Sequence, residues 1–162
     1  MDHPVHDQPR LQLIYGAQAR LSKAESRAAI IETVRDTARG IFGSDGVTFV
    51  LREGDWCHYV EEDAVSPLWK GQRFKMSACI SGWAMQNAQT VAIEDVFADP
   101  RIPHDVYRRT FVKSLIMVPV GAASPAAAIG AYWAERRKFR TEDIAAAETM
   151  ALLLGGAMKQ FL

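Results

Sequence analysis

The sequence predicts an α+β domain because the spacing of its apolar residues changes twice along the chain. Residues 10–43 carry apolar side chains at three- and four-residue steps, which is typical of amphipathic helices. Residues 46–64, 90–95 and 114–135 are rich in aromatic and β-branched residues between turn residues, which is typical of strands. From residue 141 the helical spacing returns. Helices on both sides of a block of strands indicate an α+β fold.

The N-terminal part is expected to contain a tail and a helical segment. Residues 1–9 hold two Pro, two His and two Asp without apolar periodicity, and are predicted to be disordered. Residues 10–22 are predicted to be helical because Leu11, Ile14 and Leu21 fall on one stripe.

The main domain is predicted to span residues 23–162 and to begin with a second helix. Ser22, followed three residues later by Glu25, has the pattern of a capping box and is the expected N-cap. Gly40 together with Gly43 is the expected C-terminal stop of this helix.

The next segments predict strands with irregular connections. VTFVLREG and WCHYVEED flank the turn residues Glu53-Gly54-Asp55 and are expected to form a hairpin. Residues 66–73 are expected to be irregular, and Ser77 is the expected N-cap of a short helix over CISGWAMQN. TVAIED is predicted to be a third strand.

The second half predicts a long excursion, a hairpin and a closing helix. VFADPRIPHDVYRRTFVK contains two prolines and is expected to form an excursion with one short helix; such long connections are often functional. SLIMVPV and AAAIGAYWAE are predicted to be paired strands. Thr141 is the expected N-cap of the terminal helix, and the charged run 136–138 is expected to be a solvated turn.

Composition excludes several classes of partner. Nineteen basic residues balance nineteen acidic ones, so the chain has no net field to attract nucleic acid or an anionic membrane. No apolar run approaches the roughly 20 residues needed to span a bilayer, and the start of the chain lacks the pattern of a signal peptide. Cys57 and Cys79 form no CxxC pair and are expected to be buried core thiols. A cytoplasmic protein is therefore expected.

No residue pattern predicts catalysis, a metal or a particular cofactor. His3 and His6 lie in the predicted tail, and His58 and His104 lack partners at the spacing of a metal site or a catalytic triad. Cys57 and His58 are adjacent on a predicted strand and point to opposite faces, which disfavours a shared metal. No phosphate-binding loop is present. The cofactor, if there is one, is unknown from the sequence.

Three segments in a fixed order resemble the GAF domain family. They are GWAMQNAQTVAIEDVFADPRIP, then KSLIMVPV, then AIGAYWAERRKFRTEDIAAAETMA. Gly82 opens a helix before a strand that ends at Asp95, and Phe139, Glu142 and Asp143 form the F-x-x-E-D pattern that leads into the last helix. The resemblance extends over residues 23–162. Within the family, the sequence is most similar in type to GAF domains that lie N-terminal to bacterial sensor histidine kinases. It implies an antiparallel sheet of about six strands, with the N- and C-terminal helices on one face and a ligand pocket on the other.

The resemblance places the pocket where the aromatic residues gather. Apolar walls with a few polar groups suit a small molecule. The expected ligand-binding residues are Trp56, Tyr59, Trp69, Trp83, Asp95, Phe97, Tyr107, Phe111, Met117 and Tyr132. Further polar candidates are Arg101, His104, Arg108 and Arg109. The alternative that the aromatic residues simply fill the core, with the arginines facing water, stays open.

The function implied by the resemblance is sensing without catalysis. The domain is expected to bind a small ligand or relay a conformational signal to a downstream kinase or output domain. One alternative is a free methionine-R-sulfoxide reductase, a family that needs cysteines near the glycine-opened helix and in the excursion. Ser81 stands directly before Gly82, and HDVYRRTFVK contains no cysteine. In bilin-binding relatives the chromophore is attached through a Cys next to a His, and that pair follows the Asp-containing motif. Here the pair Cys57-His58 precedes Asp95, which disfavours a bilin chromophore.

The terminal helices are expected to form a homodimer. Apolar stripes on both helices exceed what one small sheet is expected to cover, and burying them between two copies would remove apolar area from water. The stripes comprise Leu11, Ile14 and Leu21 on the first helix and Met150, Leu154, Met158 and Phe161 on the last. A dimerisation scaffold without any ligand is the second alternative.

Overall fold

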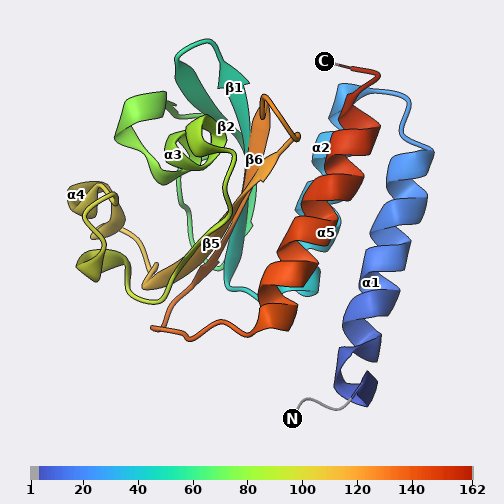
Figure 1. Cartoon of the computed structure of the whole chain (residues 1–162), viewed down its shortest axis with the longest axis horizontal. Coiled ribbons are helices and arrows are strands. Elements are labelled where there is room, and N and C mark those ends of the chain that lie inside the picture. The colour runs from blue at the N-terminus through green and yellow to red at the C-terminus, as the bar shows by residue number, and fades with distance from the viewer. Residues whose placement is uncertain (1–3, 162) are drawn as a thin grey trace.

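The computed structural model describes residues 4–161 as a sheet with helices on both faces (Figure 1). The helices of one face are α1 (Pro4–Ser22), α2 (Arg27–Phe42) and α5 (Thr141–Met158). The other face carries the 3₁₀ turns η1 (Met76–Ala78) and η2 (Val96–Ala98) and the helices α3 (Ile80–Asn87) and α4 (His104–Tyr107). The strands are β1 (Gly46–Glu53), β2 (Trp56–Ala64), β3 (Arg73–Lys75), β4 (Val91–Ile93), β5 (Ser114–Val120) and β6 (Ala127–Trp133).

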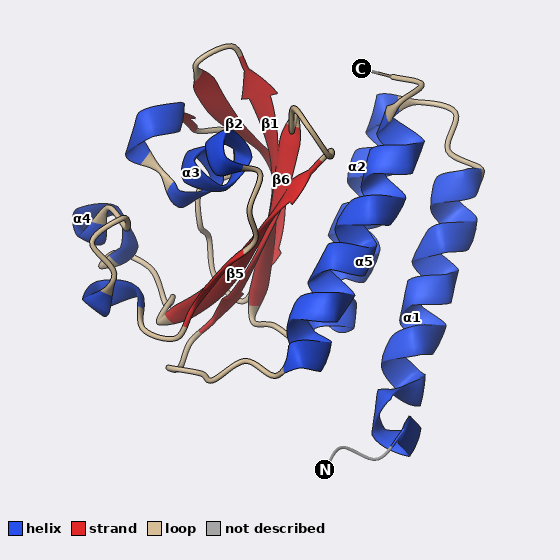
Figure 2. Cartoon of the chain, viewed as in Figure 1, coloured by secondary structure: helices blue, strands red, loops and turns tan. Residues whose placement is uncertain are grey.

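The six strands form one antiparallel sheet in the order β3-β2-β1-β6-β5-β4. This confirms the predicted fold class and the predicted hairpin of β1 and β2. The helices α2 and α5 lie directly on the sheet, and α1 packs outside them as a third layer (Figure 2). Helices α1 and α5 run in the same direction, with α2 opposed to both (Figure 1).

Alternating side chains of the strands divide the interior into two hydrophobic clusters. In β1, Val47, Phe49 and Leu51 face α2 and α5, whereas Val50 faces α3. The other long strands alternate in the same way. We call the cluster under α2 and α5 the helical core, and the cluster between the sheet and α3 and α4 the aromatic core. The sheet is therefore a wall with a separate packed interior on each side.

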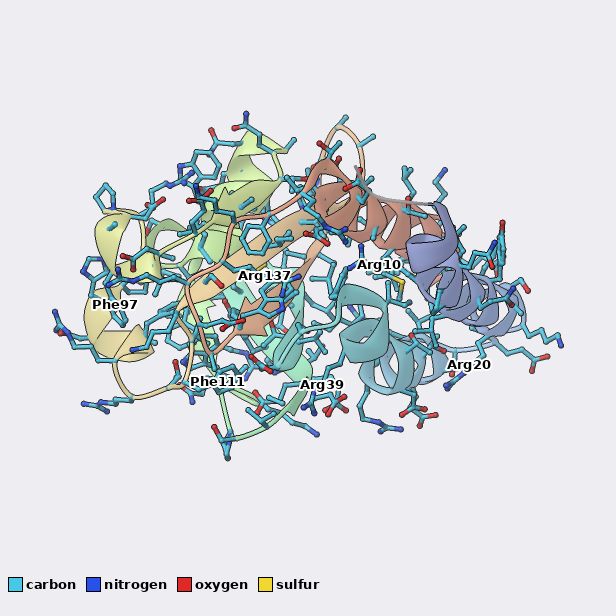
Figure 3. The ribbon with its side chains drawn as sticks, turned by 90° about the horizontal axis from the view of Figure 1, so that it is seen from below. Arg10, Arg20, Arg39, Phe97, Phe111 and Arg137 are labelled. Carbon is cyan, nitrogen blue, oxygen red and sulfur yellow. The ribbon has the colours of Figure 1, made fainter. Side chains whose placement is uncertain are left out.

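One arginine ties the outer helix to the other two. Arg10 donates through Nε to the Ile41 carbonyl at 2.9 Å, at the end of α2, and through Nη1 and Nη2 to Asp143 Oδ1 at 3.2 Å, in the first turn of α5 (Figure 3). Asp143 Oδ2 also accepts from the Arg140 N–H at 3.0 Å. The buried carboxylate thus joins α1 to the start of α5.

Several local predictions about helix ends were wrong. The N-cap of α2 is Ser26, whose Oγ accepts from the Ala29 N–H at 3.1 Å, whereas Ser22 is the last residue of α1. Ser77 lies inside η1 rather than capping α3. Thr141 is the first residue of α5, and Arg140 occupies the capping position. The predicted stop is confirmed at Gly43, with φ of 62°, whereas Gly40 lies inside α2.

Two further differences concern segments expected to be irregular. Helix α1 begins at Pro4, inside the segment 1–9 for which a tail was predicted; the part of that prediction on residues 1–3 lies outside the described residues. Residues 73–75 form β3, a short strand at the edge of the sheet. Among the described residues, no helix is long and apolar enough to cross a membrane.

Most of the stripe expected to mediate dimerisation is used within the chain. Ile14 and Leu21, like the stripe residues up to Met158 on α5, lie in the helical core. Leu154 is fully buried. Among the residues whose burial the structure describes, the large apolar side chains that remain exposed on these helices are Leu11, Leu13, Tyr15 and Leu152.

Candidate ligand site

Five of the ten predicted site residues lie together in the aromatic core. They are Tyr59, Trp69, Tyr107, Met117 and Tyr132, all buried. Trp69 is at the centre: its ring centroid lies 4.8 Å from that of Tyr107, 5.5 Å from Tyr132 and 5.8 Å from Tyr59. Edge-to-face and tilted contacts at these separations are the favourable arrangement of aromatic rings.

A carboxylate that the sequence analysis missed holds Trp69 in place. Glu62, at the end of β2, accepts backbone hydrogen bonds from Leu68, Trp69 and Lys70 at 2.8–2.9 Å. Three donors on one carboxylate fix the irregular loop and aim Trp69 into the core. A single acidic residue near the end of a strand carries no sequence signal for this role.

The other predicted residues are more peripheral. Trp83, Phe97 and Phe111 are partly buried and pack against the aromatic core, and Phe97 and Phe111 lie on the opposite side of the molecule from Arg10 (Figure 3). Trp56 is 42% exposed, with Lys75 Nζ 5.9 Å from its ring. Asp95 caps η2 by accepting from the Phe97 N–H at 3.1 Å. Trp56 and Asp95 do not line the core.

The aromatic side chains leave a cavity of only about 10 Å³, enough for about one water molecule. Its lining residues are Tyr59, Trp69, Phe74, Cys79, Pro103, Val106 and Tyr107. A surface groove of about 300 Å³ adjoins it and shares the walls Trp69, Phe74 and Val106. The groove adds the polar residues Gln72, Asp105, Arg109 and Thr110. Three apolar side chains thus line both the groove and the small cavity.

Buried hydroxyl groups in the aromatic core are paired and neutral. The Tyr59 and Ser81 hydroxyls lie 2.9 Å apart, and those of Tyr132 and Thr48 lie 2.8 Å apart. Burial raises the pKa of Tyr59, Tyr107 and Tyr132 above the ordinary value. These groups can offer hydrogen bonds to a ligand without introducing charge.

The polar candidates of the excursion mostly serve local structure. Arg101 pairs with Asp99 at 2.7 Å and lies over the Trp83 ring, 4.5 Å from its centroid. His104 Nε2 lies 2.9 Å from the Asp99 carbonyl. Arg108 forms an ion pair with Asp105. Of the predicted arginines, the groove is lined by Arg109.

The charged run 136–138 is not simply solvated, as was expected. Arg136 Nε lies 3.3 Å from Asp95 Oδ2, and the Arg137 guanidinium lies 5.0 Å from the centroid of the Trp133 ring. The Arg137 N–H donates to the Glu94 carbonyl at 3.2 Å. The segment before α5 is therefore fastened to the start of the excursion.

No three His, Cys, Asp or Glu side chains of the described residues gather closely enough to hold a metal ion. His58 faces Glu53, with Nδ1 2.7 Å from Oε2, and Cys57 faces the aromatic core. The two neighbours point to opposite sides of β2, as predicted from the strand.

Solved structures with the same architecture include GAF domains and a reductase. The GAF domain of an Acinetobacter phosphoenolpyruvate-protein phosphotransferase has a TM-score of 0.79 at 13% identity, covering 93% of each chain. A phycoerythrobilin-bound GAF domain of a cyanobacterial phytochrome has a TM-score of 0.76 at 16% identity, and the match covers 93% of this chain and 94% of that one. The free methionine-R-sulfoxide reductase of Neisseria meningitidis has a TM-score of 0.80 at 18% identity, and the match covers 94% of this chain and 92% of that one. At these identities the likeness shows the fold alone.

The sequence itself shows the family. A family model described as GAF domain matches residues 24–159, so the chain belongs to the GAF domain family. This confirms the resemblance drawn from the three ordered segments. No curated protein matches the sequence. The fold is one that other proteins use for sensing and ligand binding.

Proposed function

We propose that this GAF domain is a non-enzymatic sensory module, the cytoplasmic input of a bacterial two-component histidine kinase. In this proposal a small molecule binds on the aromatic core, and the terminal helices pass the change to a downstream kinase or output domain. The observation that carries it is a groove next to a small cavity, with Trp69, Phe74 and Val106 lining both.

Ligand entry would require these side chains to move apart. The 10 Å³ cavity is too small for any organic molecule, whereas the 300 Å³ groove approaches the size of known ligand sites. Val106 belongs to α4, a helix of four residues with few hydrogen bonds of its own. A ligand that favours the separated arrangement would shift the population toward it.

A chain of contacts supports relay from the excursion to the terminal helices. Asp95 and the carbonyl of Glu94 hold Arg136 and Arg137, which lie in the segment leading to α5. At the start of α5, Asp143 binds Arg10 of α1. A displacement of the excursion would thus act on the same segment that sets the position of both helices.

Native mass spectrometry of the purified chain tests the ligand proposal by searching for a co-purified small molecule. Val106→Trp should lose that molecule, because the larger ring would fill space in the groove and cavity that Val106 lines. Trp56→Ala is the matched control and should retain it, since Trp56 lies outside the core. Retention by Val106→Trp, or a wild-type protein that stays empty against a broad metabolite mixture, would contradict the ligand site and favour the scaffold alternative.

We also propose homodimerisation through the outer surface of α1 and α5. Leu152 is 78% exposed and Tyr15 58%, and a groove of about 480 Å³ between the two helices is lined largely by apolar residues, including Leu11 and Ala145. Leu152→Glu should yield a monomer in light scattering without loss of fold. Val65→Glu, which changes an exposed apolar residue elsewhere, should leave the dimer intact. A wild-type monomer at tens of micromolar would remove this part of the proposal.

The proposal assigns no catalytic role to any residue. The reductase alternative needs a thiol where Ser81 stands, and Ser81 instead binds the Tyr59 hydroxyl. Sustained reduction of free methionine sulfoxide by the chain, coupled to NADPH, would overturn the non-enzymatic assignment.

A further inference from the structure

A further groove follows the length of α5. Its volume is about 710 Å³, which is larger than that of either groove described above. One wall consists of residues from the segments 88–90 and 118–122. The other wall is one face of α5, whose residues recur at positions i, i+3, i+4, i+7, i+8 and i+11. These wall residues are Glu148, Ala151, Leu152, Gly155, Gly156 and Lys159.

Two of the wall residues are glycines that packing within the chain does not require. A Cβ added at Gly155 would make only ordinary contacts, at 3.7 Å from Val120 Cγ1 and 3.8 Å from the Gly121 nitrogen, and one at Gly156 would meet no atom within 4 Å. Glycine is also a poorer helix former than alanine. Beside them stands Leu152, whose side chain is 78% exposed. The wall therefore combines a projecting apolar side chain with positions where a side chain is missing.

This wall is complementary to itself. A two-fold axis that crosses α5 between residues 153 and 154 exchanges the wall residues in three pairs: Glu148 with Lys159, Ala151 with Gly156, and Leu152 with Gly155. A two-fold interface uses the same patch on both subunits, so each residue must meet its exchange partner. In an antiparallel pair of α5 helices, the Leu152 side chain of each copy would lie over the Gly155 of the other.

The charges at the two ends of the groove favour the same orientation. The antiparallel pair places the Glu148 carboxylate of each copy opposite the Lys159 ammonium of the other. The carboxylate already accepts from Thr90 Oγ1 at 2.9 Å, and it can accept further hydrogen bonds. A parallel pair in register would place like charges opposite each other. Exposed ion pairs add little affinity, but like charges disfavour the wrong orientation.

We propose that α5 packs antiparallel against α5 of a second copy, with Leu152 seated over Gly155 and Glu148 facing Lys159. The inference rests on the homodimer proposed above and gives it an orientation and a register. The absence of a Cβ at Gly155 lets the partner's leucine approach the helix backbone closely.

Disulfide cross-linking tests the orientation. Positions 148 and 159 are about 16 Å apart along one helix, too far for a disulfide within the chain. The double variant Glu148→Cys/Lys159→Cys should therefore form a covalent dimer on mild oxidation, whereas Glu148→Cys alone and Lys159→Cys alone should not. The two native cysteines are buried, and the unaltered chain measures their background. The proposal is overturned if the double variant stays uncross-linked or if Glu148→Cys alone cross-links as readily.

A matched pair of glycine variants tests the register. Gly155→Ala should weaken the dimer about tenfold in sedimentation at several concentrations, because the added methyl group lies under the partner's leucine. Gly40→Ala is the control: it also lies inside a helix, and its added Cβ meets only Leu13 Cδ1, at 3.6 Å. Thermal melts of dilute protein should show both variants folded. Equal dimer affinity in the two variants contradicts the register.

The two levels of the proposal fail in different ways. A wild type that is monomeric in light scattering removes the homodimer itself and the register with it. A dimeric wild type that Leu152→Glu dissociates, but in which Glu148→Cys alone cross-links, keeps the homodimer and overturns only the antiparallel orientation.

Discussion

The two faces of the sheet are built in different ways, although they share the same strands. The helical core lies under long regular helices, of 16 residues in α2 and 18 in α5. The aromatic core lies under α3, of eight residues, under η2 and α4, of three and four residues, and under loops positioned by side chains such as Glu62. Regular helices satisfy their own backbone, whereas short elements depend on contacts that a ligand can replace. One face is suited to stability and the other to rearrangement.

The largest expected effect is on the helical face. Leu154→Ala should lower the free energy of unfolding by about 3 kcal/mol, because a fully buried side chain leaves a cavity between well-packed elements. Chemical denaturation measures it. Leu152→Ala, two residues away and 78% exposed, is the control and should change the free energy by less than about 0.5 kcal/mol. Equal effects in the two variants would mean that α5 packs with another face toward the sheet.

A second prediction tests how tightly the aromatic face is built at α3. A Cβ added at Gly82 would lie 1.9 Å from the Met76 carbonyl oxygen, a backbone atom, so η1 or α3 must shift. Gly82→Ala should therefore cost about 2 kcal/mol. Gly156→Ala is the comparison, since no atom lies within 4 Å of its added Cβ, and replacing a helical glycine there should be neutral or stabilising. Urea denaturation of both variants distinguishes these outcomes.

The smallest effect is expected where Arg10 meets Asp143. Burial raises the pKa of Asp143, but hydrogen bonds from the Arg140 N–H and the Arg10 guanidinium outweigh it, and the net pKa lies below the ordinary value. A lowered folded-state pKa gives stability that is present above the unfolded value near 3.9 and is lost as pH falls through the folded pKa. Asp143→Asn should cost about 1.5 kcal/mol at pH 7 and progressively less below about pH 4. If the difference in unfolding free energy between wild type and Asp143→Asn does not shrink in acid, the charge of Asp143 is not the source of the stabilisation.

The sequence predicted five of the six strands and the helices because each carries several residues of clear periodicity. β3 was not predicted because Arg73, Phe74 and Lys75 are too few residues to show a strand alternation. Their strand conformation depends on pairing with β2. The cap of α2 was placed four residues early, since Ser22 and Ser26 both have the right side chain and only backbone geometry distinguishes them.

For the candidate site, the resemblance to GAF domains predicted a group of ten residues, of which five gather in the aromatic core, but it did not predict how closely they pack. Ring orientation decides whether aromatic side chains line a pocket or fill it, and Trp69 fills most of the space. Both cysteines are buried, as predicted.

The edges of the sheet bear on how such a module avoids unwanted assembly. Its edge strands, β3 and β4, have three residues each, and β3 carries Arg73 and Lys75. An exposed strand of this length and charge is a poor template for another chain, because strand addition needs a continuous row of free backbone groups. Fibre-like growth by edge-to-edge pairing is therefore disfavoured at both edges, so that copies of the domain can be held close together without their sheets joining.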